Sequence, residues 1–207
     1  LREPDPAYAG RQDGVSGIIE SNSYVLSGLI VGDGGVPVRN PIVKDDPAKI
    51  KRALLSNIEG IDLVLIIAGS SAGSEDYTRS IIEESGDVLV HGVSMMPGKP
   101  ALIGKLKGRP IIGIPGYPVS AVIAYERLVR PMLYQALHVM MPERPKIKVF
   151  PTGKLPSKLG TEEFLRVKVG YVGGKFFATP LPRGSGVITS LTRADGIIRI
   201  PSLSEGL

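Results

Sequence analysis

The chain has 207 residues, a formal net charge of +5 and a hydrophobic fraction of 43%, which is ordinary for a globular protein with a core. It has no cysteine and only two histidines, which excludes disulfides and thiolate chemistry and disfavours polyhistidine metal centres and Ser-His-Asp triads. No apolar run approaches the roughly 20 residues that a membrane-spanning helix needs. The composition therefore predicts a globular protein without a membrane segment, whose chemistry depends on carboxylates, hydroxyls, backbone amides, lysine and arginine.

The first half of the chain alternates helical and strand-like patterns. The run 62–68 is continuously apolar and β-branched, which is typical of a parallel strand covered on both faces. Asp46 followed by Pro47 predicts a helix start, because aspartate is a favoured N-cap and proline suits the first helical position. In chain order, the expected elements are a helix over 23–31 capped by Ser21 or Asn22, a strand over 36–43, a helix over 46–57, a strand over 62–68, a helix over 77–85, a strand over 88–93, a hairpin over 101–106 and 110–114, and a helix over 119–137.

Strand–loop–helix repeats of this kind predict an α/β domain with a mostly parallel sheet and helices on both faces. The pattern changes after the linker 141–145, because only strand-like segments follow it. These segments are 146–151, 164–172, 175–181 and 197–200. We therefore expect an α/β domain over 1–143, followed by a small all-β domain over 144–207.

Three loops follow strands of the α/β part, at the sheet edge where open α/β sheets bind ligands. The loop 68–76 contains three serines and two glycines before a helix, so its backbone amides suit an anion. The turn 95–100 holds Lys99 between two prolines, and a rigidly placed ammonium suits phosphate or another oxyanion. The turn 114–120 also leads from a strand into a helix. Each could be a plain structural turn, but together they favour a phosphate-bearing ligand.

Carboxylates accompany these loops. Asp45 follows the strand expected over 36–43, and the loop 68–76 ends in Glu75 and Asp76. Carboxylates on neighbouring sheet loops, without histidine, suit magnesium held partly through water. The alternative is that the acidic pair at 45–46 only caps the following helix.

The chain resembles the MoeA family of molybdopterin molybdenumtransferases, to which the gephyrin E domain is related. Five motifs in the family's order, between about Gly17 and Leu207, carry the resemblance. They are Ala68–Tyr77, His91-Gly92, Pro97–Pro100, Ile114–Ala121 and Gly184–Gly196. The resemblance implies a role in molybdenum cofactor biosynthesis. The expected enzyme takes adenylylated molybdopterin and molybdate or tungstate, uses a divalent metal such as Mg²⁺, and releases AMP. It also implies a MogA-like molybdopterin-binding α/β domain and the family's C-terminal β-domain.

The resemblance assigns roles to residues at matching positions. Asp45 and Asp76 match the family's catalytic and metal-associated acids. The positions associated with the molybdate oxyanion are Lys99, Ser120, Arg166 and Ser190. The positions in loops that cradle the pterin and its phosphates are Ser70, Ser71, Gly73, Pro115, Gly116 and Pro118.

The family's proteins are much longer than this chain. Leu1 matches the end of the family's Thr-Gly-Asp-Glu-Leu strand, so we expect the first strand of the domain upstream of residue 1. We likewise expect Leu207 to lie within the β-domain rather than at its end. The resemblance implies a homodimer in which N-terminal domains of the same polypeptide complete the site. Neither nucleic acid nor membrane is an expected partner, and the lack of a signal peptide and of cysteine favours the cytoplasm.

Three positions depart from the family's pattern. Met96 stands where the family commonly has lysine, so one cation is missing beside the oxyanion. Ser74 replaces an acid and Tyr117 an asparagine. These departures favour, as an alternative, a scaffold relative that binds molybdopterin or the oxyanion without turnover. A MogA-like adenylyltransferase or a CinA-like nucleotide enzyme is disfavoured, because both lack the appended β-domain and the Pro-Gly-Lys-Pro turn.

Overall fold

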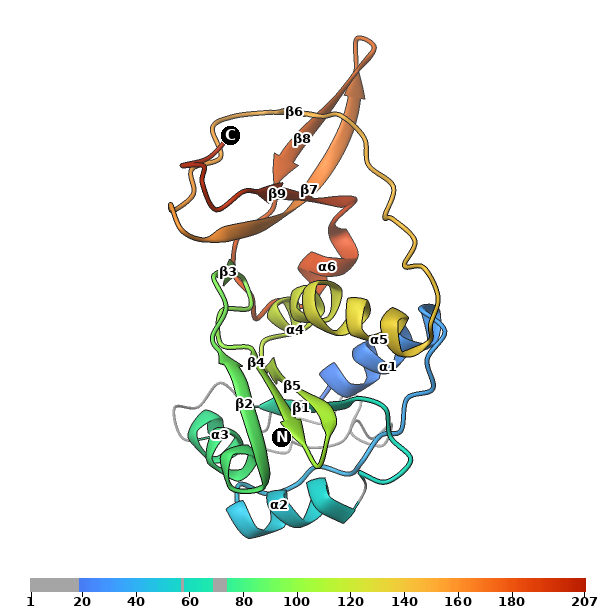
Figure 1. The fold of residues 1–207 in the computed structure, drawn as a ribbon. Coiled ribbons are helices and arrows are strands. Elements are labelled where there is room, and N and C mark those ends of the chain that lie inside the picture. The colour runs from blue at the N-terminus through green and yellow to red at the C-terminus, as the bar shows by residue number, and fades with distance from the viewer. Residues whose placement is uncertain (1–18, 57, 69–73) are drawn as a thin grey trace, which may run out of the picture.

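The structure is a computed structural model that describes residues 19–56, 58–68 and 74–207. It contains an α/β part and a smaller, mainly β part joined by a long linker (Figure 1). The elements of the first part are α1 (Asn22–Gly32), α2 (Pro47–Ser56), β1 (Val64–Ala68), α3 (Ser74–Ser85), β2 (Gly86–His91), β3 (Met95–Met96), β4 (Leu102–Leu106), β5 (Arg109–Pro115), α4 (Pro118–Ala124), a π-helical turn (Tyr125–Val129) and α5 (Arg130–Ala136). Those of the second part are β6 (Phe150–Pro151), β7 (Glu162–Val172), β8 (Lys175–Pro180), α6 (Thr189–Arg193) and β9 (Gly196–Ile200).

The sheet of the α/β part has the strand order β1-β5-β4-β2. The α/β class is confirmed, but the expectation of a mostly parallel sheet is wrong for the described strands. Only β1 and β5 pair in parallel, whereas β4 is antiparallel to both β5 and β2. The predicted hairpin explains the difference: Lys107 and Gly108 both have positive φ, as a two-residue type I′ turn requires, and such a turn reverses the chain.

Helices cover both faces of this sheet, as predicted (Figure 1). Neighbouring residues of β5 point to opposite faces, because side chains alternate along a strand. Ile112 and Ile114 pack in the core formed with α1, α4 and the π-helical turn. Ile111 packs on the other face, in the cluster formed with α2 and α3. Within the described residues, no helix combines the length and the apolar character needed to cross a membrane.

Local signals were correct at two helix starts and wrong for one strand. Asp46 caps α2 as predicted, since its Oδ1 accepts the amide hydrogens of Ala48 and Lys49 at 3.0 and 3.2 Å. The N-cap position of α1 is Ser21, one of the two predicted residues, but its side chain makes no capping hydrogen bond. The carboxylate of Glu20 accepts the Ser23 amide instead, at 2.8 Å. No strand forms over 36–43, where prolines at 37 and 41 each remove a backbone donor.

The expected helix over 119–137 is present but is not uniform. It consists of α4, the π-helical turn and α5 in direct succession. Pro131 follows the π-helical turn, and a proline cannot donate the hydrogen bond that continues a regular α-helix. The helix therefore changes type over Tyr125–Val129, shortly before Pro131.

The second sheet has the order β3-β7-β8-β6, with β9 on β7. Two of its features differ from the expected all-β domain. It contains the short helix α6, whose Leu191 packs against the core of the α/β part. The second sheet also includes β3, a strand of the first part, with Met95 paired to Glu162 and Met96 to Glu163 (Figure 1). The two parts therefore share a strand as well as a linker.

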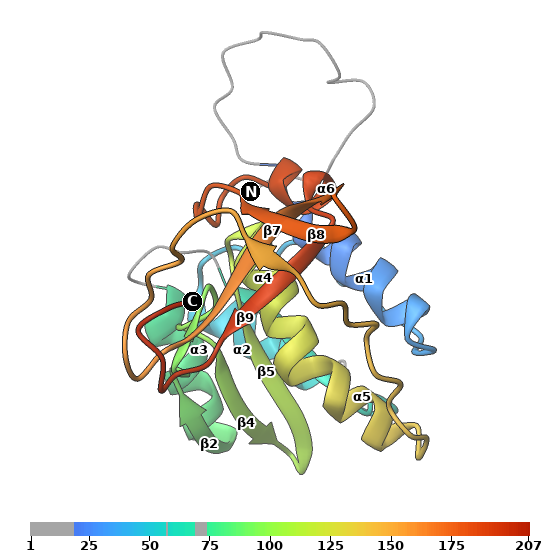
Figure 2. The same ribbon diagram turned by 90° about the horizontal axis from the view of Figure 1, so that it is seen from above.

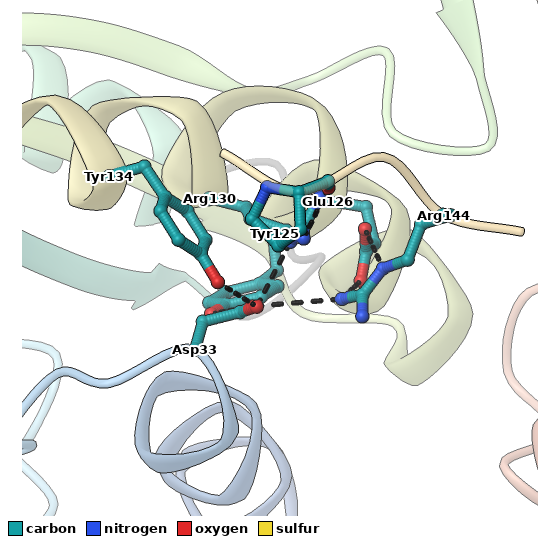
Figure 3. A network of polar contacts seen from close by, with 7 residues as sticks. Asp33, Tyr125, Glu126, Arg130, Tyr134 and Arg144 are labelled. Carbon is teal, nitrogen blue, oxygen red and sulfur yellow. Dashed lines mark hydrogen bonds and ion pairs between the residues drawn. The ribbon is translucent and has the colours of Figure 1, made fainter. Parts of the chain in front are cut away.

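A buried polar network holds the start of the linker against the helices (Figure 3). Asp33, at the C-terminal end of α1, accepts hydrogen bonds from Tyr125 at 2.8 Å, Arg130 at 3.0 Å and Tyr134 at 3.1 Å. Burial pushes the pKa of Asp33 upward, but these three hydrogen bonds outweigh it and lower the pKa below its usual range. Burial and the nearby carboxylate also raise the pKa of Tyr125, so its hydroxyl stays protonated and can donate.

Two linker residues join this network. Arg130 donates to the carbonyl of Pro142 at 3.0 Å, and Arg144 pairs with Glu126 at 2.6 Å. A longer ion pair, 3.6 Å, connects Arg144 to Asp33. The linker thus leaves the end of α5 and returns along it before it enters the second part (Figure 2).

Candidate functional site

Two of the three predicted loops start from neighbouring strand ends, those of β1 and β5. These strands are parallel neighbours, with Ala68 paired to Pro115, so the loops that follow them leave from the same edge of the sheet. Of the first loop, Ser70, Ser71 and Gly73 lie outside the described residues. Asp76 is in the first turn of α3, and its side chain also lies outside the described part.

Distant segments hold the loop that follows β5. The buried Asn22 at the start of α1 donates from Nδ2 to the carbonyl of Gly116 at 2.7 Å. The amide of Val119, in the first turn of α4, donates to the carbonyl of Ser185 at 3.1 Å. Pro115, Gly116 and Pro118 are therefore placed between α1 on one side and the turn 184–186 of the second part on the other.

Arg166, on the central strand β7, is the most unusual cation of the described chain. It is only 2% exposed, and its Nη2 donates to the carbonyls of Pro182 at 2.5 Å and Gly184 at 3.0 Å. Its buried Nε has no hydrogen-bond partner among the described residues. Burial lowers the pKa of this guanidinium, although arginine remains charged in proteins. A buried cation with an unused donor is costly unless an anion binds it.

A small pocket of about 30 Å³ lies beside Arg166. Its size suits a small ion and excludes a pterin ring. Pairing of β3 with β7 creates it, because that pairing sets the turn after β3 against the strand that carries Arg166. The lining residues are Met96, Pro97, Glu163, Phe164, Leu165, Arg166, Leu181 and Arg183. The structure thus joins the predicted turn 95–100 to Arg166.

The other residues expected at the oxyanion lie around this region in different environments. Lys99 is exposed in the turn that follows Pro97. Ser120 is buried in the first turn of α4, next to the Val119 that bonds to the second part. Ser190 is buried in α6, and its hydroxyl donates to the carbonyl of Val187 at 2.6 Å.

Asp45 is exposed in the irregular segment before α2, so the premise that it follows a strand was wrong. Its neighbour Asp46 is engaged as the helix cap. Across the described ranges, no three histidine, aspartate or glutamate side chains gather as a metal site. Because the side chain of Asp76 is outside those ranges, the pairing of Asp45 with Asp76 at a metal stays a prediction.

Sequence reasoning missed three polar residues of this region: Asn22, Glu163 and Arg183. Asn22 was considered only as a helix cap, and its actual acceptor lies 94 residues away. Glu163 is 5% exposed at its side chain and pairs with Arg183 at 3.0 Å. No local signal marked Glu163, because it precedes the strand expected over 164–172 and follows a second glutamate, Glu162.

These features define the class of protein: an α/β domain in which two of the loops predicted to bind an anion start at one sheet edge, with a β-domain that adds a buried arginine. Two known families match in the same order. Residues 12–135 match the family described as "Probable molybdopterin binding domain", and residues 148–207 match the MoeA C-terminal region, domain IV. The chain belongs to the MoeA family.

Relatives and solved structures agree with this assignment. A protein of Methanocaldococcus jannaschii named for molybdopterin biosynthesis is 36% identical over 189 residues, which is 91% of this chain and 44% of that protein. Molybdopterin molybdenumtransferase 2 of Mycobacterium tuberculosis is 31% identical over 89% of this chain and 47% of its own length. The crystal structure of a MoeA protein from Pyrococcus horikoshii superimposes with a TM-score of 0.78 at 33% identity, over 99% of this chain and 50% of that one. The chain spans about half the length of the relatives it matches.

Proposed function

We propose that the protein carrying this chain is a transferase of molybdenum cofactor biosynthesis. The proposed reaction inserts molybdate or tungstate into adenylylated molybdopterin and releases AMP. The observation that carries the proposal is the buried Arg166, whose Nε is unpartnered among the described residues beside a pocket sized for a small ion. Two relatives with nearly full coverage of this chain are named for molybdopterin biosynthesis or molybdenum transfer.

Each loop has a proposed task. Arg166, Lys99, Ser120 and Ser190 bind the oxyanion, because a guanidinium, an ammonium and hydroxyls together offer charge and directional donors. The pterin phosphates lie against the loops at the ends of β1 and β5, where backbone amides meet an anion at a helix start. The loop residues proposed for this task are Ser70, Ser71, Gly73, Pro115, Gly116 and Pro118.

Asp45 and Asp76 are the proposed magnesium ligands. The exposed carboxylate of Asp45 fits this task, since Mg²⁺ prefers one or two carboxylates and keeps several waters. Bound Mg²⁺ would neutralise charge on the phosphates at the bond that breaks. The carboxylates themselves hold the ion and orient its waters.

We also propose the assembly in which this takes place. The protein acts as a cytoplasmic homodimer, with the remaining domains of the same polypeptide completing the site. The boundary between the two domains of this chain lies at residues 143 and 144, in the linker that Arg144 joins to Glu126.

Replacement of Asp76 by asparagine tests the proposed reaction. We expect AMP release by the intact protein to be abolished while the melting temperature is retained, because asparagine preserves shape but removes the charge that holds the metal. Asp87→Asn, which removes an exposed carboxylate from β2, is the matched control and should retain full turnover. Turnover of Asp76→Asn within about threefold of wild type, under roughly 1 kcal/mol in barrier, would refute the assignment.

Competition among oxyanions gives a second test, by calorimetric titration of the intact protein. Tungstate and sulfate should compete with molybdate, because a guanidinium and hydroxyls recognise the charge and shape shared by all three. The affinity for each should fall as ionic strength rises, since salt screens charges that solvent reaches. Molybdate binding that tungstate does not displace would contradict the proposed site.

A scaffold that binds without turnover is the second candidate. It is favoured by Met96, which lines the pocket and presents no charge there. Tight binding of adenylylated molybdopterin and molybdate, without AMP release, would establish this candidate in place of the transferase.

A further inference from the structure

We propose that Arg183, positioned by Glu163, is a second oxyanion-binding residue and supplies the positive charge that Met96 does not. This inference rests on the proposed function, because it takes the pocket beside Arg166 as the oxyanion site. Arg183, Glu163 and Met96 all line that pocket together with Arg166.

The backbone that carries Arg183 is held by Arg166 itself. The two carbonyls that Arg166 binds belong to Pro182 and Gly184, the residues on either side of Arg183. One guanidinium therefore fixes the turn from which the other extends. The position of the Arg183 backbone therefore depends on Arg166 and not on surface contacts alone.

The side chain of Arg183 is also held, with donors left over. Its Nη1 binds Glu163 at 3.0 Å, and its Nη2 donates to the carbonyl of Pro156 at 2.6 Å. A guanidinium has five N–H donors, so these two contacts leave donors for a ligand. The Arg183 side chain is 47% exposed, which leaves it accessible to an ion that enters the pocket.

The net charge of the pocket wall favours an anion only when Arg183 is present. Glu163 is nearly buried in the pocket wall, and its carboxylate would repel an oxyanion. With Arg183 present, the three charged groups leave one net positive charge; without it, Arg166 and Glu163 cancel. Loss of Arg183 would thus remove one attraction and expose one repulsion, a larger effect than loss of an ordinary surface cation.

Titration of molybdate into the intact protein tests the proposal. We expect Arg183→Gln to weaken binding at least tenfold, and Arg183→Lys, which retains the charge, to stay within threefold of wild type. Arg199→Gln is the matched control: Arg199 is an exposed arginine on neighbouring β9 that pairs with Glu162, the residue before Glu163. It removes the same charge from the same sheet and should change affinity less than twofold.

A rescue experiment separates binding from folding. Adding Met96→Lys to Arg183→Gln returns a cation to the same pocket, so the double variant should recover affinity to within threefold of wild type. Unchanged affinity in Arg183→Gln, or no recovery in a double variant with a normal melting temperature, would overturn the role of Arg183. If Arg166→Gln also leaves molybdate affinity unchanged, the pocket is not the oxyanion site and the proposed function of this site fails with it.

Discussion

Replacing Asp33 by alanine should lower the free energy of unfolding by about 3–5 kcal/mol, the cost typical of removing one partner from a buried ion pair. Asp33 and Arg130 are 5% and 4% exposed at their side chains, so the guanidinium would be left buried without its anion. The hydroxyls of Tyr125 and Tyr134 would lose their acceptor at the same time. Urea denaturation measures the change.

Asp62→Ala is the control for this substitution. Asp62 is 83% exposed at its side chain and reaches Arg109 only at 4.0 Å, so its loss should cost less than about 1 kcal/mol.

The hydrogen-bond network around Asp33 also predicts how stability depends on pH. Because the pKa of Asp33 is lowered on folding, its contribution is present above the ordinary aspartate pKa of about 3.9 and is lost as the pH falls through the folded value. Asp33→Asn should flatten stability against pH below about pH 4; an unchanged slope would contradict the assignment.

Replacing Arg166 by glutamine should weaken molybdate binding by at least about 100-fold. Two charge-assisted hydrogen bonds, each worth roughly 1.5–3 kcal/mol, are at stake, and about 1.4 kcal/mol corresponds to one factor of ten. Glutamine keeps a donor for the carbonyls of Pro182 and Gly184 but removes the charge. Calorimetric titration measures the affinity, and a thermal melt of the same sample verifies the fold.

Arg193→Gln serves as the control for Arg166, because Arg193 is an exposed arginine of α6, the helix that contains Ser190. It should bind molybdate within twofold of wild type. If Arg166→Gln bound as tightly as this control while remaining folded, the buried guanidinium would have only a structural role, in holding the turn that carries Arg183.

Much of the architecture follows from short-range signals in the sequence. The apolar run of β1, the hairpin at Lys107 and Gly108, and the cap at Asp46 each depend on residues within a few positions of one another. Backbone preferences and side-chain periodicity act over that range, so these elements could be predicted. That two loops start from one sheet edge also followed, because strand ends determine where loops emerge. The family resemblance then indicated Arg166.

Other features required the tertiary structure. The sequence shows β3 as a turn, and only its pairing with β7 creates the pocket that Arg166 and Arg183 share. The hydrogen bonds to Asp33 join residues 92 to 101 positions apart, and Asn22 meets Gly116 across 94. Neither hydrophobic periodicity nor turn residues predict such pairs, since each pair depends on how whole elements pack. The sequence by itself determined most of the elements, the α/β class and the loops proposed to carry the chemistry, whereas packing over long separations decided which charges meet at the pocket.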